Sequence, residues 1–119
     1  MDKKQLGMYG ELMAARYLRK HGYTILEPNF HSRFGEIDLV AKIEDTIVFV
    51  EVKTRTEDFY HRPAEAVNLA KQQKIKKTAM CFLNTLDCEV NVRFDVVEVV
   101  AITCGQKKVK INHIQSAFE

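Results

Sequence analysis

Two short apolar runs that alternate with polar residues, with a polar turn between them, constrain the fold of this chain more than any other feature. The first run covers residues 35–42, the second covers residues 46–53, and Glu44-Asp45 lies between them. Alternation with a period of two is typical of β-strands, and two such runs joined by a short turn pair as an antiparallel hairpin. This turn places both apolar sets on one face, in the opposed pairs Ile37 with Val52, Leu39 with Val50, and Ala41 with Val48.

The same register brings charged residues together on the opposite face of the hairpin. Asp38 lies opposite Glu51, and Glu36 lies opposite Lys53. Two carboxylates about 5 Å apart at their Cβ atoms repel each other and weaken the hairpin. A divalent cation between them reverses this effect, because carboxylate oxygens are the ligands that Mg²⁺ and Mn²⁺ prefer. The pattern therefore predicts a metal site formed by Asp38 and Glu51.

Lys53 completes a pattern that suits phosphodiester hydrolysis. It follows Glu51 by two residues, so both side chains point to the same face. A metal polarises the phosphoryl oxygen and activates a bound water, and a lysine there orients that water or offsets the charge that develops on the phosphate. The alternative is a plain Glu36–Lys53 ion pair with solvated Asp38 and Glu51. The second strand is apolar on both faces, which favours a buried Glu51 that needs a partner.

The rest of the chain predicts an α/β (α+β) fold with the order helix, three strands, helix, two strands, and a mixed sheet flanked by helices. Leu6, Tyr9, Met13 and Tyr17 form the apolar stripe expected of the first helix. Pro28-Asn29 is expected to end the first strand. The predicted helices cover residues 3–21 and 63–83, the predicted strands cover residues 23–27, 35–42, 46–53, 90–102 and 108–111, and residues 54–62 are expected to form a loop.

Length and composition indicate one domain over residues 1–119. The chain is 46% hydrophobic and 29% charged, which suits a folded core. No apolar run approaches the ~20 residues of a membrane helix, and no hydrophobic signal region follows the first residues, so we expect a cytoplasmic protein without membrane contact. The net charge of +2 neither demands nor excludes nucleic acid. Three cysteines without a CxxC or Cys/His cluster argue against a zinc site.

The ordered set of motifs resembles the PD-(D/E)xK nuclease superfamily and, more narrowly, the bacterial YraN-like family, which is related in fold to archaeal Holliday-junction resolvases. The superfamily pattern is Gly-Glu-Ile-Asp-Leu-Val at residues 35–40, followed by Glu-Val-Lys at residues 51–53. Twelve residues separate Asp38 from Glu51. The similarity spans nearly the whole chain, in residues 9–11, 35–40, 49–55, 63–67 and 93–97. It implies a restriction-endonuclease-like αβββαβ core and a metal-dependent nuclease-type site.

Carried over by position, the resemblance assigns a role to four residues. Asp38 and Glu51 are the expected metal ligands, with Mg²⁺ or Mn²⁺ as the cofactor. Lys53 is the expected catalytic lysine. Glu11 is the expected helix-borne acid that joins the site.

Two departures and one alternative accompany this assignment. His31 stands in the stretch 29–31 where the family usually shows an arginine, which weakens a substrate contact. Ile37 precedes Asp38 where the superfamily has proline, and neither change removes a ligand. Glu11 has no basic residue three or four positions away on its helix, so the alternative for it is an exposed glutamate without a role.

Basic residues around the second helix are candidates for binding nucleic acid. Phe59 and Tyr60 lie near them in sequence, and a surface of this kind offers cations for phosphates and rings for bases. The alternative is a solvated helix face, the usual meaning of scattered lysines. The candidates are Arg33, Arg55, Arg62, Lys71 and Lys74.

Several residues stay open between two roles. Lys71 or Gln72 lies where the superfamily often carries a further polar site residue. Arg93 and Asp95 are two apart and share one strand face, so structural pairing and substrate contact explain them equally well. His113 has no partner that the sequence suggests.

The leading hypothesis is a metal-dependent endonuclease that cleaves structured DNA, branched DNA included. The alternative is a non-catalytic module that keeps the nuclease fold and binds branched nucleic acid. A third reading is an assembly subunit whose carboxylates bind metal only for stability. A homodimer is expected by analogy with the resolvases, because a four-way junction presents two symmetric strands.

Overall fold

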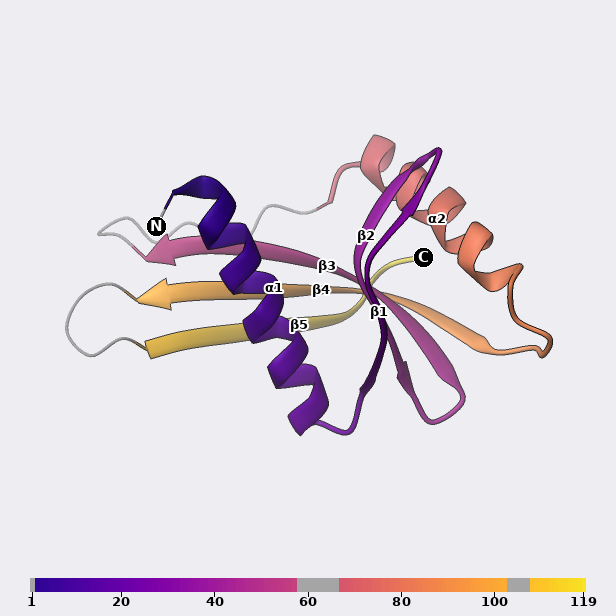
Figure 1. The fold of residues 1–119 in the computed structure, drawn as a ribbon, viewed down its shortest axis with the longest axis horizontal. Helices are drawn as coiled ribbons and strands as arrows, with labels where there is room; N and C mark the ends of the chain where they lie inside the picture. Colours follow the sequence, from indigo (N-terminus) through magenta and orange to yellow (C-terminus); the bar gives the residue numbers. More distant parts are fainter. Residues whose placement is uncertain (1, 58–66, 103–107) are drawn as a thin grey trace.

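Five strands form one mixed sheet with a helix on each face (Figure 1). The computed structural model describes residues 2–57, 67–102 and 108–119. Its elements are α1 (Lys3–Lys20), β1 (Thr24–Ser32), β2 (Gly35–Ile43), β3 (Thr46–Glu57), α2 (Leu69–Leu83), β4 (Asn91–Ile102) and β5 (Lys108–Phe118). The predicted order of helix, three strands, helix and two strands is confirmed.

The strands lie in the sheet in the order in which they follow one another in the sequence. Neighbours are antiparallel, except for β3 and β4, which are parallel. A parallel pair needs a crossover connection, and α2 lies within the connection between these two strands. This arrangement is the mixed sheet flanked by helices that a restriction-endonuclease-like core predicts.

The core consists of two clusters of buried side chains, one on each side of the sheet. The cluster under α1 contains Ala14, Ala15, Leu18, Tyr23, Leu39, Ala41, Val48, Val50, Val97 and Val99. The cluster under α2 contains Ile37, Val40, Ile47, Phe49, Val67, Ile75, Ala79, Phe82 and Val96. Alternating residues of β3 enter opposite clusters, which explains why this strand is apolar on both faces.

The predicted hairpin register is confirmed from the turn to the pair Leu39–Val50, and it is wrong beyond that pair. The ladder between β2 and β3 ends there, so Asp38 and Glu51 are not ladder partners. The Asp38 carboxylate instead accepts the backbone N–H of Val52 at 2.7 Å. The two strands therefore separate at the position where the acidic residues lie.

The other two expected pairs on this stretch are also wrong, because only the ladder between β2 and β1 continues there. Ile37 lies opposite Phe30 and packs in the cluster under α2, whereas Leu39 packs under α1. Glu36 lies opposite His31, whose Nδ1 is 3.3 Å from the glutamate, so the Glu36–Lys53 ion pair does not form. The regular alternation of β2 side chains between the two faces of the sheet thus ends at Asp38.

Strand β1 continues through Pro28-Asn29 to Ser32, although the sequence was expected to end it there. Because β1 is an edge strand, the missing N–H of proline costs little in the ladder. Asn29 has a φ of 51°, a left-handed conformation that asparagine tolerates better than most residues. Strands β3 and β5 are also longer than predicted, and residues 54–57 are strand because they pair with β4 as far as Ile102.

The described part of the second helix begins at Leu69, later than the predicted residue 63. Asn68 caps it by accepting the backbone N–H of Lys71 at 2.8 Å, a typical helix start. Phe59, Tyr60 and Arg62 lie outside the described residues. Within the described parts of the chain, no helix combines the length and the apolar character that spanning a membrane requires.

Helix α1 approaches β3 closely because the residues between them are small. The predicted stripe is displaced by about one position: the buried residues are Gly10, Ala14, Ala15 and Leu18. A Cβ atom placed on Gly10 would lie 1.8 Å from Oγ1 of Thr54. Gly10 therefore sets the distance between the sheet and the helix turn that carries Glu11.

We expect Gly10→Ala to lower the free energy of unfolding by about 1–3 kcal/mol, because the added methyl group displaces α1 from Thr54. Gly7→Ala is the matched control, since nothing lies within 4 Å of its added Cβ. That change should stabilise the helix by about 0.5–1 kcal/mol. Urea unfolding measures both variants, and equal effects would show that α1 does not rest on Thr54.

Candidate functional site

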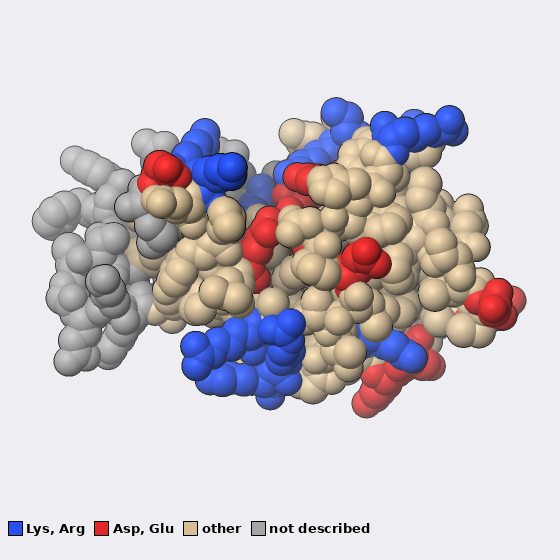
Figure 2. Space-filling model, viewed as in Figure 1, with Lys and Arg blue, Asp and Glu red and all other residues tan. Residues whose placement is uncertain are grey.

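Acidic side chains gather in a hollow across the middle of the molecule. Figure 2 shows them between the part of the surface formed by α1 and the part formed by α2 and the β1–β2 hairpin. Three of the predicted site residues are acids whose charges act on one another, and two of them lie where β2 and β3 separate. The three are Asp38 on β2, Glu51 on β3 and Glu11 on α1.

Asp38 is the carboxylate on which the other charges act. It is half-buried, and burial raises its pKa to about 7, with the negative charges of Glu51 and Glu11 acting in the same direction. The hydrogen bond from Val52 and the charge of Lys71 oppose this rise without cancelling it. The charges of Glu51 and Glu11 thus both act on the Asp38 carboxylate.

Glu51 is buried, with 8% of its surface exposed, and its partner is the ammonium group of Lys71. Lys71 lies in the first turn of α2, where the Asn68 cap fixes its backbone. Burial opposes the charged form of Lys71. However, the hydrogen bond and charge of Glu51, together with the charges of Asp38 and Glu36, outweigh burial and raise the lysine pKa. Lys71 is therefore a member of the acidic site.

Gln72, the other candidate for this role, faces elsewhere. Its side-chain amide donates a hydrogen bond to the carbonyl oxygen of Val67 at 2.8 Å. Gln72 thus holds the chain that leads into α2, and Lys71 alone of these two neighbours reaches the carboxylates.

Lys53 lies two residues beyond Glu51 on β3 and is half-buried. Its neighbour in the parallel ladder is Glu98 of β4, which is buried. Among the described residues, no side chain forms a hydrogen bond or an ion pair with the Lys53 ammonium group. The role that the sequence predicts for Lys53, acting on substrate or water, stays a prediction.

The residues predicted to contact nucleic acid differ in burial and in their ion-pair partners. Arg55 is three-quarters buried, and its Nε lies 3.4 Å from the buried carboxylate of Glu98, so it is part of the structure of the sheet. Arg33 and Lys74 are exposed near the tip of the β1–β2 hairpin. Lys71 pairs with Glu51, and Arg62 lies outside the described residues.

The donor set suits a divalent cation held by few protein ligands. Among the residues that the structure describes, no three histidine, cysteine, aspartate or glutamate side chains converge on one point. Mg²⁺ commonly binds through one or two carboxylates and keeps several waters. Asp38 and Glu51 supply such a pair, because burial and the negative charge of Glu51 raise the pKa of Asp38, and a cation would offset both effects. The residues present therefore fit Mg²⁺ or Mn²⁺, with Glu11 beside the pair.

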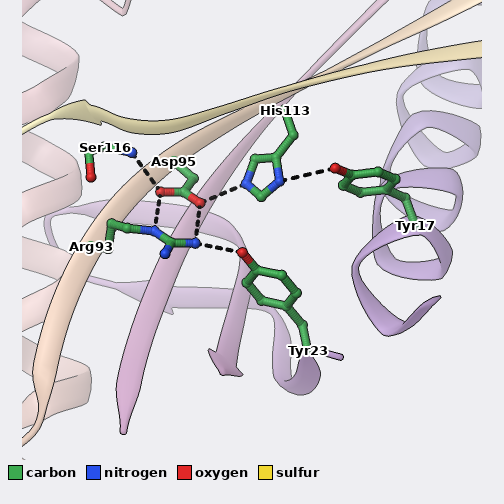
Figure 3. A network of polar contacts seen from close by, with 6 residues as sticks. All are labelled: Tyr17, Tyr23, Arg93, Asp95, His113 and Ser116. Atoms are coloured by element: carbon green, nitrogen blue, oxygen red, sulfur yellow. Dashed lines mark hydrogen bonds and ion pairs between the residues drawn. The ribbon is translucent and has the colours of Figure 1, made fainter. Parts of the chain in front are cut away.

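A second polar cluster lies on the α1 side of the sheet, and the sequence suggested only the pairing of Arg93 with Asp95 within it (Figure 3). Asp95 is fully buried and accepts two hydrogen bonds from Arg93, both 2.9 Å long. It also lies 2.7 Å from Nε2 of His113 and accepts the backbone N–H of Ser116 at 3.0 Å. Burial opposes the charge of Asp95, but these donors outweigh burial and lower its pKa.

This cluster ties the end of α1 to the sheet. The Arg93 guanidinium group donates a hydrogen bond to the hydroxyl group of Tyr23 at 2.6 Å, and Tyr17 lies 3.3 Å from Nδ1 of His113. His113, for which the sequence suggested no partner, joins β5 to both Asp95 and α1. Of the two roles left open for Arg93 and Asp95, structural pairing accounts for their contacts.

Comparison with known proteins places the chain in a family. Residues 10–99 match the model of "Uncharacterised protein family UPF0102". A UPF0102 protein of Alkaliphilus oremlandii is 47% identical over 118 residues, which cover 97% of this chain and 98% of the relative. Relatives in Syntrophomonas wolfei (97% of this chain, 98% of the relative) and Caldanaerobacter subterraneus (99% and 98%) are 48% and 46% identical. The chain therefore belongs to the UPF0102 family, the YraN-like family that its motifs resemble.

Proposed function

We propose that this protein is a metal-dependent endonuclease of the PD-(D/E)xK type, which hydrolyses phosphodiester bonds in structured, branched DNA in the cytoplasm. The observation that supports this most strongly is the meeting of Asp38 and Glu51 where β2 and β3 separate. Each of these strands is fixed on its far side by another strand, so the carboxylates are held together against their repulsion. Two carboxylates held together lower the stability of the fold, and a cation bound between them would remove their repulsion.

Each residue of the site has a separate task in this proposal. Asp38 and Glu51 hold Mg²⁺ or Mn²⁺, and Glu11 adds negative charge beside them. When bound, the metal polarises the phosphoryl oxygen and lowers the pKa of a water. Lys53, which follows Glu51 on the same strand, orients the attacking water or offsets the charge that develops on the phosphate. Lys71 compensates the charge of the buried Glu51.

A second candidate function is a non-catalytic module that keeps the nuclease fold and binds branched nucleic acid. The Lys71–Glu51 contact favours it, because the ammonium group already balances the charge of the buried glutamate without a metal. The two functions differ in what Glu51 does. A nuclease loses its chemistry without this carboxylate, whereas a binding module keeps its affinity for nucleic acid.

Cleavage of a labelled panel decides between the two functions. The panel contains duplex, single-stranded, flap and four-way-junction DNA, each with Mg²⁺ or Mn²⁺. We expect the wild type to cleave a branched species and Glu51→Gln to cleave it at least about 100-fold more slowly, because one carboxylate ligand is lost. Glu27→Gln, which changes an exposed glutamate of β1, is the control and should cleave like the wild type.

Two outcomes would contradict the nuclease proposal. The first is cleavage by Glu51→Gln at the rate of the wild type. The second is salt-sensitive binding of a branched species by the wild type with no cleavage of any substrate, which would support the binding module instead.

A further inference from the structure

The tip of the β1–β2 hairpin rests on α2 in a fixed position. Oγ of Ser32 lies 2.8 Å from Oγ1 of Thr78, and Ser32 also accepts the backbone N–H of Phe34 at 3.1 Å. A Cβ atom on Gly35 would lie 3.7 Å from Cβ of Lys74, so the tip and the helix are in close contact. The residues of the tip are therefore held beside the lysines of α2.

Two cations lie against one aromatic ring at this tip. The Arg33 guanidinium carbon is 4.8 Å from the centre of the Phe34 ring, and the Lys77 ammonium group is 5.6 Å from it. Both distances are within the range of a cation–π interaction. An aromatic ring orders a cation without cancelling its charge, in contrast to a carboxylate. The Phe34 ring thus positions the charged groups of Arg33 and Lys77.

No acidic partner compensates these charges in the part of the chain that the structure describes. Arg33, Lys74 and Lys77 are exposed, and no described carboxylate lies within 4 Å of their charged groups. Other basic residues near the hollow behave differently, since Lys71 pairs with Glu51 and Arg55 lies beside Glu98. The tip is therefore a local excess of positive charge in a chain whose net charge is only +2.

The tip is connected to the acidic hollow by a row of lysines. Lys71, Lys74 and Lys77 are spaced three residues apart on α2, so they lie on neighbouring turns of one broad face. Their span along the helix axis is about 9 Å, close to the length of three nucleotides of a B-form strand at about 3.4 Å each. The row begins at Glu51 and ends at the Phe34 ring.

We propose that Arg33, Phe34, Lys74 and Lys77, here called the hairpin-tip patch, bind the phosphates of the nucleic-acid strand that leads away from the acidic hollow. This inference rests on the proposed function, and it specifies how that site holds its substrate. A strand of phosphates fits the patch because the cations form a row a few nucleotides long, and the row starts at the carboxylates.

Binding without cleavage tests the patch. Fluorescence anisotropy with a labelled four-way junction and a labelled single strand, in EDTA and over a range of salt concentrations, measures affinity alone. The test variant is the triple change Arg33→Gln, Lys74→Gln and Lys77→Gln. The control triple Arg19→Gln, Lys42→Gln and Lys110→Gln removes the same charge from exposed residues of α1, β2 and β5.

We expect the test triple to weaken binding by about 10-fold or more and to reduce the slope of log affinity against log salt by about two to three, because up to three phosphate contacts are lost. The control triple should change affinity by less than about two-fold. Phe34→Leu, which keeps every charge and removes the ring, should weaken binding by a few-fold because Arg33 and Lys77 are no longer ordered. Circular dichroism verifies that each variant is folded.

Two outcomes would overturn the inference: wild-type affinity in the test triple, or equal weakening by the two triples. Cleavage and binding are measured separately, so failure of the proposed nuclease function can be told apart from failure of the hairpin-tip patch. If the wild type binds through the patch but cleaves nothing, the nuclease proposal fails and the patch stands. If the wild type cleaves and the test triple binds as tightly as the wild type, the patch fails and the nuclease stands.

Discussion

Replacing Asp95 by asparagine is expected to lower the free energy of unfolding by about 3–5 kcal/mol, the range for breaking a buried ion pair. Asp95 is fully buried and joins Arg93, His113 and the backbone of Ser116. Without its charge, the guanidinium group of Arg93 loses its compensating anion. A domain of this size is stable by about 5–15 kcal/mol, so the loss is a large share of the total.

The destabilisation caused by Asp95→Asn is expected to depend on pH and to be larger near neutral pH than in acid. The pKa of Asp95 is lower in the folded protein than in the unfolded chain, so its charge stabilises the fold above the ordinary aspartate pKa. That contribution is lost as the pH falls through the folded-state pKa. The difference between wild type and Asp95→Asn should therefore be largest near neutral pH and shrink on acidification below about pH 4.

Urea unfolding at several pH values measures the Asp95 effect. Asp87→Asn is the control, because Asp87 is exposed and its change should cost less than about 0.5 kcal/mol. An Asp95→Asn variant within 1 kcal/mol of the wild type at pH 7 would contradict the anchoring role of this cluster.

Asp38→Asn is expected to have the opposite effect and to stabilise the metal-free protein above pH 7 by about 2–4 kcal/mol. Burial and the charges of Glu51 and Glu11 raise the pKa of Asp38 from 3.8 to about 7. As the pH rises between these values, the unfolded chain releases a proton that the folded protein retains, so the wild type loses stability. Asparagine carries no charge, and its side-chain oxygen still accepts the N–H of Val52.

Thermal unfolding in EDTA at pH 5 and pH 8 measures this effect. The variant's advantage should be larger at pH 8, where the penalty of the ionised carboxylate is complete. Glu27→Gln serves as the control and should show no such difference, because Glu27 is exposed on β1. A variant that is less stable than the wild type at both pH values would mean that Asp38 supports the fold and is not strained by its neighbours.

The sequence predicted the hairpin up to Leu39–Val50 because alternation and a two-residue turn are local signals. It failed at Asp38 because the end of the ladder depends on a third strand. The start of β2 pairs with β1 as far as Gly35, whereas its pairing with β3 ends at Leu39. No spacing within the hairpin carries that information.

The hairpin pattern drew attention to Asp38 and Glu51, but it placed them as ladder partners, which they are not. The contact of Lys71 with Glu51 could not be read from spacing, because Lys71 reaches Glu51 from a helix that begins at Leu69. Asn68 is a residue that favours helix caps, and it is a signal that would have moved the predicted start. The Asp95–His113 contact joins residues on different strands, and only the tertiary fold brings them together.

Binding of Mn²⁺ is the most direct test of the claim that Asp38 and Glu51 form a cation site. Electron paramagnetic resonance counts the free ion during a titration of the wild type, Glu51→Gln and the Glu27→Gln control at pH 7.5. We predict saturable binding to the wild type and the control, and at least about 10-fold weaker binding to Glu51→Gln, because the pair loses one of its two charged ligands. Equal Mn²⁺ affinity in Glu51→Gln and the wild type would contradict the account.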